Sequence, residues 1–178
     1  MDTIYLDNAA TTPMHDEVLQ AMLPYLKQNF GNPSTTYSIG RTAKAAIESA
    51  RKTLAQLINA HPSEIIFTAG GTEANNLAIK SAVAHLGIER IITSVIEHSC
   101  VKNTVQYLHD FNGIELIKLP VDELGIINLE ALETLLQNSS KKTLVTLMHA
   151  NNEIGTLLDI KKVSELCQHY QAVFHSDR

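Results

Sequence analysis

The sequence predicts an α/β fold in three layers, a mostly parallel sheet covered by helices on both faces. From about residue 64 onward, short apolar runs rich in β-branched residues alternate with stretches of helical periodicity. Of the 178 residues, 44% are hydrophobic and 19% are charged, which is typical of a globular domain that buries its own core. No internal repeat, low-complexity tract or long linker divides the sequence, so we expect one domain.

Composition and charge exclude several classes of partner. The net charge is −5 and there is no basic run, which argues against nucleic acids and membrane surfaces. Two cysteines, Cys100 and Cys167, are too few for a disulfide scaffold and lack C-x-x-C spacing. The first residues do not resemble a signal peptide, and no apolar run approaches the ~20 residues of a membrane span. We therefore expect a cytoplasmic protein that binds a small molecule or another protein.

The first sixty residues are expected to be mainly helical. The segment 7–13 is an extended lead-in to a helix, with Thr12 as its cap and Pro13 at the first helical position. Pro24 is expected to kink this helix or to end its regular part early. After a loop at 31–34, a long amphipathic helix is marked by Ala43, Ala46, Ile47, Ala50, Leu54, Leu57 and Ile58.

Five strands are expected in the remainder, with helices between them. The strands are predicted at 64–70, 90–96, 114–119, 143–150 and 172–177. The helices are predicted to start near Thr72, Ser99, Asn128 and Asp159. In such parallel sheets ligands bind at the carboxyl ends of the strands, so the residues just past each strand are candidates for a site.

The turn Gly70-Gly71-Thr72 is the first candidate. It joins an apolar run to the start of a helix, where unpartnered N–H groups and the helix dipole favour an anion, most often phosphate. The purely steric alternative is that two glycines simply allow a tight turn. The spacing matches neither a dinucleotide-binding fingerprint nor a Walker A loop.

Three other strand ends are polar. They carry Glu97-His98, the run from Met148 through Asn151 to Glu153, and His175-Ser176-Asp177. Together with the glycine turn they offer one crevice an anion cradle, an imidazole, an amide and a carboxylate. Glu153 is either a general base or a buried polar anchor of its loop. The strand at 114–119 runs into Leu119-Pro120-Val121, which indicates a structural role only.

A phosphorylated, flat, nitrogen-containing ring would use every part of that set. The cradle would hold the phosphate, the imidazole would stack on the ring, and the amide would bond a ring oxygen. A carboxylate beside the ring nitrogen favours the protonated pyridine, which is a better sink for electrons from a substrate. Pyridoxal 5'-phosphate has these properties.

Five segments carry a resemblance to a known family. They are 5–13 (YLDNAATTP), 30–34 (FGNPS), 70–76 (GGTEANN), 97–98 (EH) and 148–156 (MHANNEIGT). In order and spacing they resemble the cysteine desulfurase family of the class V aminotransferase superfamily, which includes nitrogen-fixation and housekeeping iron–sulfur cluster enzymes. The resemblance covers the entire chain and implies the large domain of a fold type I pyridoxal-phosphate enzyme.

The resemblance implies a role for each matching position. Gly71 and Thr72 would bind the cofactor phosphate, and Asn151 would bond the phenolic oxygen of the ring. His98 would stack on the pyridine and act in catalysis as a proton relay, and Asp177 would pair with the pyridine nitrogen.

The resemblance also implies substrate, reaction and partners. Asn8 and Ala9 would line the substrate pocket. The family converts L-cysteine to L-alanine and transfers the sulfur to an enzyme cysteine as a persulfide. Sulfur-accepting scaffold or carrier proteins are the expected partners, and the full-length form is expected to be a homodimer.

The chain departs from the family at its end. Family members continue past the last strand to a Ser-x-His-Lys stretch, whose lysine forms the Schiff base, and to a loop cysteine that takes the sulfur. This sequence stops at Asp177-Arg178, and Arg178 stands where the family usually has alanine. We therefore expect residues 1–178 to be an N-terminal lead-in plus part of the large domain, without the small domain, and inactive alone.

Other interpretations stay open. The chain could represent a related pyridoxal-phosphate enzyme, such as a selenocysteine lyase or a class V aminotransferase, or a non-catalytic truncated product. His98, His149, His175 and Asp177 could instead bind a metal, although the phosphate cradle would then be unexplained. Cys100, near the crevice at a helix start, is a candidate reactive thiol, whereas Cys167 is expected to pack in the core.

Overall fold

The computed structural model describes residues 4–177, which form two compact units that divide between Phe67 and Thr68. The predicted extent of 1–178 includes Met1–Thr3 and Arg178, which lie outside the described residues. Within the described chain, no helix has both the length and the apolar character that a membrane crossing requires.

The first unit contains helices α1 (Asp16–Lys27) and α2 (Ser38–Leu57) and the short 3-10 helix η1 (Pro62–Glu64). The predicted start of α1 at Thr12 and Pro13 is wrong. His15 is the N-cap instead, and its Nδ1 accepts a hydrogen bond from the Glu17 N–H at 3.4 Å. This start also places Asp16 and Glu17 in the first turn, where their negative charges interact favourably with the positive end of the helix dipole.

The sequence predicted that Pro24 kinks α1 or ends its regular part early; the early end is wrong, and the kink stays a prediction. The helix continues to Lys27 because proline removes only its own N–H, while its carbonyl remains an acceptor. The N–H groups of Gln28 and Asn29 both donate to the Pro24 carbonyl at 2.8 Å. The long amphipathic helix predicted next is confirmed as α2.

The predicted strand at 64–70 is also wrong. Residues 65–68 follow η1 and pair with no strand among the described residues. Within the first unit this segment is held by α2 instead: the Arg51 guanidinium donates to the Ile65 carbonyl and lies 4.9 Å from the centre of the Phe67 ring. The apolar composition that suggested a strand therefore serves side-chain packing.

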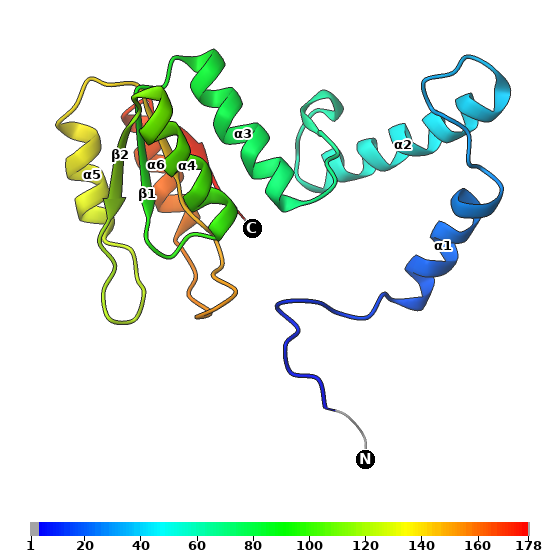
Figure 1. Cartoon of the computed structure of the whole chain (residues 1–178), viewed down its shortest axis with the longest axis horizontal. Helices are drawn as coiled ribbons and strands as arrows, with labels where there is room; N and C mark the ends of the chain where they lie inside the picture. Colours follow the sequence, from blue (N-terminus) through cyan, green and yellow to red (C-terminus); the bar gives the residue numbers. More distant parts are fainter. Residues whose placement is uncertain (1–3, 178) are drawn as a thin grey trace. The chain divides into compact units, whose positions relative to one another are not determined.

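The second unit carries the sheet and matches the predicted alternation. Strands β1 (Arg90–Ser94), β2 (Glu115–Leu119), β3 (Thr143–Thr146) and β4 (Val173–His175) are all parallel, in the order β2-β1-β3-β4. The helices are α3 (Gly71–Leu86), α4 (Ser99–Asn112), α5 (Leu129–Gln137) and α6 (Ile160–His169). Each of these helices starts within one residue of its predicted position. Figure 1 shows α3, α4, α5 and α6 with the strands of this unit.

The two faces of the sheet carry separate cores, which confirms the three-layer fold. Ile91 and Leu144 are register partners and pack with α3 and α4 on one face. Their neighbours Ile92 and Val145 point to the other face and pack with α5 and α6. All four side chains are fully buried.

The strand order places a crevice at the carboxyl ends of the strands. The chain passes from β1 to β2 on one side and then crosses back to β3 on the other side of β1. In parallel sheets such a reversal leaves an opening beyond the carboxyl ends of the two diverging strands, where ligands bind. The segments that follow β1 and β3 therefore border the expected site.

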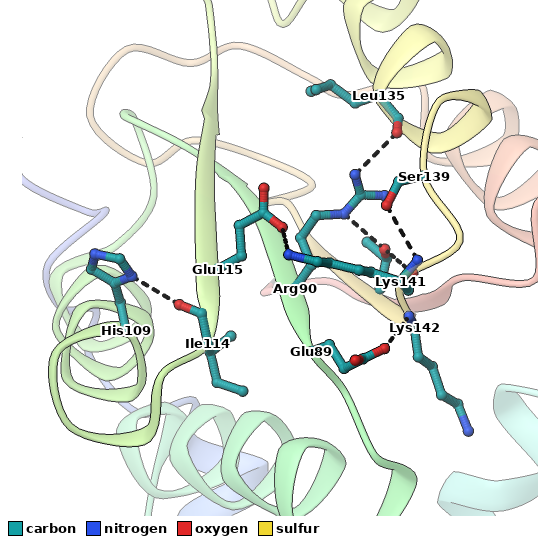
Figure 2. Close-up of polar contacts among 10 residues, drawn as sticks. Glu89, Arg90, His109, Ile114, Glu115, Leu135, Ser139, Lys141 and Lys142 are labelled. Atoms are coloured by element: carbon teal, nitrogen blue, oxygen red, sulfur yellow. Dashed lines mark hydrogen bonds and ion pairs between the residues drawn. The ribbon is translucent and has the colours of Figure 1, made fainter.

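Polar contacts hold the amino ends of the strands together (Figure 2). Arg90, only 4% exposed, donates from Nε to the Thr143 hydroxyl at 3.0 Å and from its guanidinium to the Leu135 carbonyl at 3.1 Å. It thus links β1, β3 and α5. At the surface, Lys141 Nζ lies 2.8 Å from a carboxylate oxygen of Glu115.

Candidate functional site

A cavity of about 330 Å³ lies at the carboxyl ends of the strands in the second unit. It is lined by Gly71, Thr72, Asn75, His98, Cys100, Met148, Ala150, Asn152 and Asp177. Four of the residues predicted from the sequence, Gly71, Thr72, His98 and Asp177, therefore line one cavity. They come from the starts of α3 and α4 and from the segment after β4.

The start of α3 presents bare backbone to open space. A Cβ placed on Gly70 or Gly71 would meet no atom within 4 Å. The first bond of the helix runs from the Ala74 N–H to the Gly70 carbonyl, and no described residue accepts from the N–H groups of Gly71 and Thr72. Glu73 braces the turn by accepting the Ala69 N–H at 2.7 Å. With 16 residues of aligned dipole behind it, this turn is suited to an anion.

His98 caps α4 and borders the cavity. Its Nδ1 accepts the Cys100 N–H at 3.2 Å and lies 2.9 Å from the Cys100 sulfur. An Nδ1 that accepts a backbone N–H carries no proton in the neutral ring, so these contacts assign the proton to Nε2. Capping thus orients the imidazole and selects its tautomer.

A series of hydrogen-bonded polar side chains extends from the wall of the cavity into the sheet. His175 Nδ1 lies 2.8 Å from the Thr146 hydroxyl and His175 Nε2 lies 3.1 Å from Asn75 Oδ1. Asn75 Nδ2 then donates to the Cys100 sulfur at 3.3 Å. Burial lowers the pKa of His175, which nearby Asp177 opposes, so the ring is favoured in its neutral form.

Sequence reasoning missed Asn75. A signal was present, because Asn75 lies on the same helical face as the buried residues Ile79 and Ala82. A polar residue at a core position of a helix is unfavourable unless a partner is present.

The position of Asp177 is fixed by hydrogen bonds between the segments that follow β3 and β4. The His149 N–H donates to the Asp177 carbonyl at 2.9 Å, and the Ser176 hydroxyl donates to the Leu147 carbonyl at 2.9 Å. These bonds continue the β3–β4 pairing past the end of the strands, so the Asp177 carboxylate borders the cavity.

Asn151 has a structural role that the sequence did not predict for it, as the anchor of its own loop. Its Nδ2 donates to the Ile96 carbonyl at 2.8 Å, and its Oδ1 accepts the N–H groups of Glu153 and Ile154 at 2.9 and 3.1 Å. It borders an adjoining cavity of about 420 Å³ and not the one that Asp177 lines. Asn151 is thus the buried anchor of its loop, a role the sequence allowed for the exposed Glu153. Its predicted contact with a ring oxygen stays a prediction.

Glu97 joins the two strands at the crevice. It is 2% exposed, and its Oε1 accepts the Ser94 hydroxyl at 2.6 Å and the Met148 N–H at 3.1 Å. No described residue bonds its Oε2. Burial raises the pKa of Glu97 and so does the charge of Asp177, while the bonds from Ser94 and Met148 oppose the rise. Sequence reasoning placed Glu97 at a strand end without giving it a role.

The set of possible metal ligands predicted from the sequence, His98, His149, His175 and Asp177, needs a correction. The ring nitrogens of His175 are engaged by Thr146 and Asn75, and His149 Nδ1 is buried without a partner among the described residues. The ligand atoms that do come together are those of His98, Cys100 and Asp177, all within 4.8 Å of one another. Cys100, whose reactivity the sequence left open, therefore belongs to the cavity wall, while Cys167 packs in the core as predicted.

Asn8 and Ala9 belong to the first unit. The N–H groups of Ala10 and Thr11 donate to the Asp7 carbonyl at 3.1 and 3.4 Å, which folds this segment into a turn. Their substrate-binding role stays a prediction.

The cavity therefore combines groups suited to the two ends of one ligand. Unpartnered N–H groups beside open space suit a phosphate, and the Asp177 carboxylate suits a protonated ring nitrogen. His98 borders the space between them with an oriented imidazole. This donor set fits a phosphorylated pyridine.

Comparison with known proteins agrees with this chemistry. The family described as aminotransferase class-V matches residues 4–178. The chain is 45% identical to a cysteine desulfurase IscS of Methanosarcina thermophila and 41% identical to a mitosomal cysteine desulfurase of Trachipleistophora hominis. Each match covers 98% of this chain but only 43% and 40% of these relatives. The chain thus spans less than half their length.

Solved structures resemble the chain over a similar extent. A structure titled NifS-like protein matches with a TM-score of 0.90 at 34% identity, covering 98% of this chain and 48% of that one. A structure titled SspA in complex with cysteine matches with a TM-score of 0.90 at 37% identity, covering 99% and 50%. A NifS-like protein from Rickettsia africae matches with a TM-score of 0.85 at 35% identity, covering 99% and 48%.

Proposed function

The chain belongs to the class-V aminotransferase family, and on this basis we propose that it forms the cofactor-holding part of a pyridoxal-phosphate-dependent cysteine desulfurase. The proposed reaction converts L-cysteine to L-alanine and passes the sulfur to an enzyme cysteine as a persulfide. One observation carries the proposal: the free N–H groups of α3, the His98 imidazole and the Asp177 carboxylate share one cavity.

The substrate and partners follow from the relatives. Those with 41–45% identity are named cysteine desulfurases, and a solved structure at 37% identity is titled as a complex with cysteine. These names support L-cysteine as the substrate. We further propose iron–sulfur cluster assembly as the purpose, with sulfur-accepting scaffold or carrier proteins as partners and a homodimer as the full-length form.

The chain's own residues would share the work of holding the cofactor. The N–H groups of Gly71 and Thr72, with the Thr72 hydroxyl, would bind the phosphate at the positive end of α3. Asp177 would keep a proton on the ring nitrogen, because an adjacent carboxylate favours the charged pyridine. When bound, pyridoxal phosphate supplies an electron sink for the substrate carbon.

His98 would move protons. With Nδ1 tied to the Cys100 N–H, the Nε2 of the neutral ring carries the proton. In this tautomer the ring would donate a hydrogen bond from Nε2, and a proton relay through the ring would require Nδ1 to exchange its bond to the Cys100 N–H for a proton. Its place at the cavity wall suits both stacking on a flat ring and proton relay.

Binding of pyridoxine 5'-phosphate tests the proposal. This compound lacks the aldehyde, so adducts with surface lysines do not contribute to the signal. We expect calorimetry to show binding by the wild-type chain and a loss of affinity of about tenfold or more in Asp177→Asn, because a neutral amide no longer favours the protonated ring.

Two controls sharpen the test. Asp159→Asn removes a carboxylate that caps α6, outside the lining of this cavity, and should leave the affinity unchanged. Pyridoxine without its phosphate should bind far more weakly than the phosphorylated form. Equal affinities of wild type and Asp177→Asn, or of pyridoxine with and without phosphate, would refute the proposed cofactor site.

A further inference from the structure

We propose that His98, Cys100 and Asp177 form a binding site for a thiophilic divalent cation of the zinc type, and that this ion and the cofactor exclude one another. The metal site stands on the geometry of the three side chains alone. The exclusion rests on the proposed function, because it requires that the cofactor occupy the same cavity.

The three ligand atoms are already gathered. One nitrogen, one sulfur and one carboxylate oxygen lie within 4.8 Å of one another, and His98 Nδ1 lies 2.9 Å from Cys100 Sγ. Around a tetrahedral zinc with bonds of about 2.0–2.3 Å, ligand atoms are separated by about 3.5 Å. Side-chain rotations that change these separations by roughly 1.3 Å or less therefore complete the triad.

The backbone fixes where these side chains start. His98 is the N-cap of α4 and Cys100 lies in its first turn, so the helix start fixes their backbones, and a metal bound at Nδ1 replaces the capping bond from the Cys100 N–H. Asp177 is held opposite by the bond from the His149 N–H to its carbonyl. The ligands thus come from two rigid ends of the sheet unit, as a preorganised metal site requires.

A supporting contact to the sulfur is also present. The amide of Asn75, 5% exposed, donates to Cys100 Sγ at 3.3 Å and is itself oriented by His175. Hydrogen bonds from buried groups to metal-bound ligands are typical of protein metal sites, and they favour the charged form of the ligand.

The chemistry of the set selects the metal class. When the Zn–S bond forms, the Cys100 thiol releases its proton to solvent, so the thiolate and the Asp177 carboxylate together balance the charge of a divalent ion. His98 adds a neutral nitrogen, and the cavity leaves a fourth position for water, so three protein ligands suffice. Magnesium and calcium prefer oxygen ligands only, which a thiol and an imidazole do not offer.

Exclusion follows from shared residues. All three ligands line the 330 Å³ cavity, and His98 and Asp177 are the residues proposed to contact the pyridine ring. An ion bound by His98 and Asp177 would engage the two side chains that are proposed to contact the ring. The cation and the phosphorylated pyridine therefore compete for the chain.

Cobalt(II) titration tests the metal site directly. A thiolate bound to Co²⁺ gives a near-ultraviolet charge-transfer absorption, which we expect in the wild-type chain and which Zn²⁺ should remove by displacement. Cys100→Ser should abolish the band and weaken Co²⁺ binding at least tenfold. Circular dichroism of the same samples checks that the variant is folded.

Cys167→Ser is the matched control. Cys167 is the only other cysteine of the sequence, it is 2% exposed in the core on the α5 and α6 face, and burial raises the pKa of its thiol to about 11. The variant should keep the wild-type band. A band that persists in Cys100→Ser, or that disappears only in Cys167→Ser, or Co²⁺ affinities equal in wild type and Cys100→Ser, would overturn the metal site.

Competition tests the exclusion. We expect saturating Zn²⁺ to lower the affinity of the wild-type chain for pyridoxine 5'-phosphate at least tenfold, and to have little effect in Cys100→Ser. If the cobalt band appears but zinc leaves this affinity unchanged, the exclusion is wrong and the metal site stands. If pyridoxine 5'-phosphate does not bind at all, the proposed function and the exclusion fail together, and the cobalt titration alone decides the metal site.

Discussion

A single buried amide organises the polar side of the cavity. Asn75 accepts from His175 through its oxygen and donates to Cys100 through its nitrogen, so both halves of the amide are occupied in a side chain that is only 5% exposed. Within such a network, each member that is lost leaves its partners unsatisfied. The stability of this region therefore depends on hydrogen bonds between side chains of α3, α4 and β4.

Replacement of Asn75 measures that dependence. Asn75→Leu removes the acceptor for His175 Nε2 and leaves this N–H buried without a partner, so we expect the free energy of unfolding to fall by about 1–3 kcal/mol. Urea denaturation followed by circular dichroism measures the change. Asn76→Ala, which removes only a bond to the Thr72 carbonyl on an exposed face, should change the free energy by less than about 0.5 kcal/mol. Equal losses in both variants would contradict the network.

Glu97 makes stability depend on pH. Burial, with a contribution from Asp177, raises its pKa in the folded protein above the unfolded value, so the folded state holds the proton more tightly. The stabilisation from the protonated carboxyl is complete below the unfolded pKa and is lost as pH rises through the folded pKa. Glu97→Gln keeps an oxygen for Ser94 and Met148 but carries no charge.

The variant should therefore gain stability relative to wild type as pH rises. We expect the difference in unfolding free energy, Glu97→Gln minus wild type, to increase from pH 4 to pH 8, by about 1.4 kcal/mol for each unit of pKa shift. Denaturant titrations at several pH values in metal-free buffer measure it. A difference that is constant with pH would contradict a raised pKa, and Glu89→Gln, at an exposed carboxylate, serves as the control for general charge effects.

At the scale of elements, the helix starts of the second unit were predicted better than the strands. Asn128 and Asp159 accept the Ala131 and Lys162 N–H groups, and His98 caps α4, so local chemistry decided where these helices begin. The strand predicted at 64–70 failed because a strand needs a partner, and apolar β-branched residues do not show whether one is present. That segment is held instead by the packing of the Arg51 guanidinium on the Phe67 ring.

Arg90 joins three elements at the amino ends of the strands, on the side of the sheet away from the cavity (Figure 2). Arg90→Ala removes its bonds to Thr143 and Leu135 and the packing of its buried stem, so we expect a loss of about 2 kcal/mol in unfolding free energy. Lys141→Ala breaks only the exposed pair with Glu115 and should cost about 0.5 kcal/mol or less. Thermal and urea unfolding measure both variants, and a larger effect of Lys141→Ala would contradict this ranking.

At the scale of the whole molecule, strand order decides where the site lies. Because β1 lies between β2 and β3, the segments after β1 and β3 diverge to opposite faces and leave the cavity between them. Helices α3 and α4 start at that same edge, which adds two positive helix ends to it. The arrangement concentrates binding groups but brings no lysine into the lining of the cavity.

The activity of the 178-residue chain follows from that lining. We expect no release of sulfide from L-cysteine above a protein-free pyridoxal-phosphate control, because no lysine borders the cavity to attach the cofactor and hold it for turnover. A methylene-blue assay for sulfide, run with matched cofactor concentrations, measures this. Turnover above the control, lost in Asp177→Asn, would refute the prediction.

The sequence by itself determined the alternation of strands and helices in the second unit, the parallel sheet and the polar ends of β1, β3 and β4, because periodicity and caps act over a few residues. Only the tertiary structure decided which side chains meet: Asn75 lies 25 residues from Cys100 and 100 residues from His175. It likewise assigned Asn151 to its own loop and joined Cys100 to His98 and Asp177. Such contacts depend on strand order and on the registers between strands, which determine distances in space that spacing along the chain does not contain.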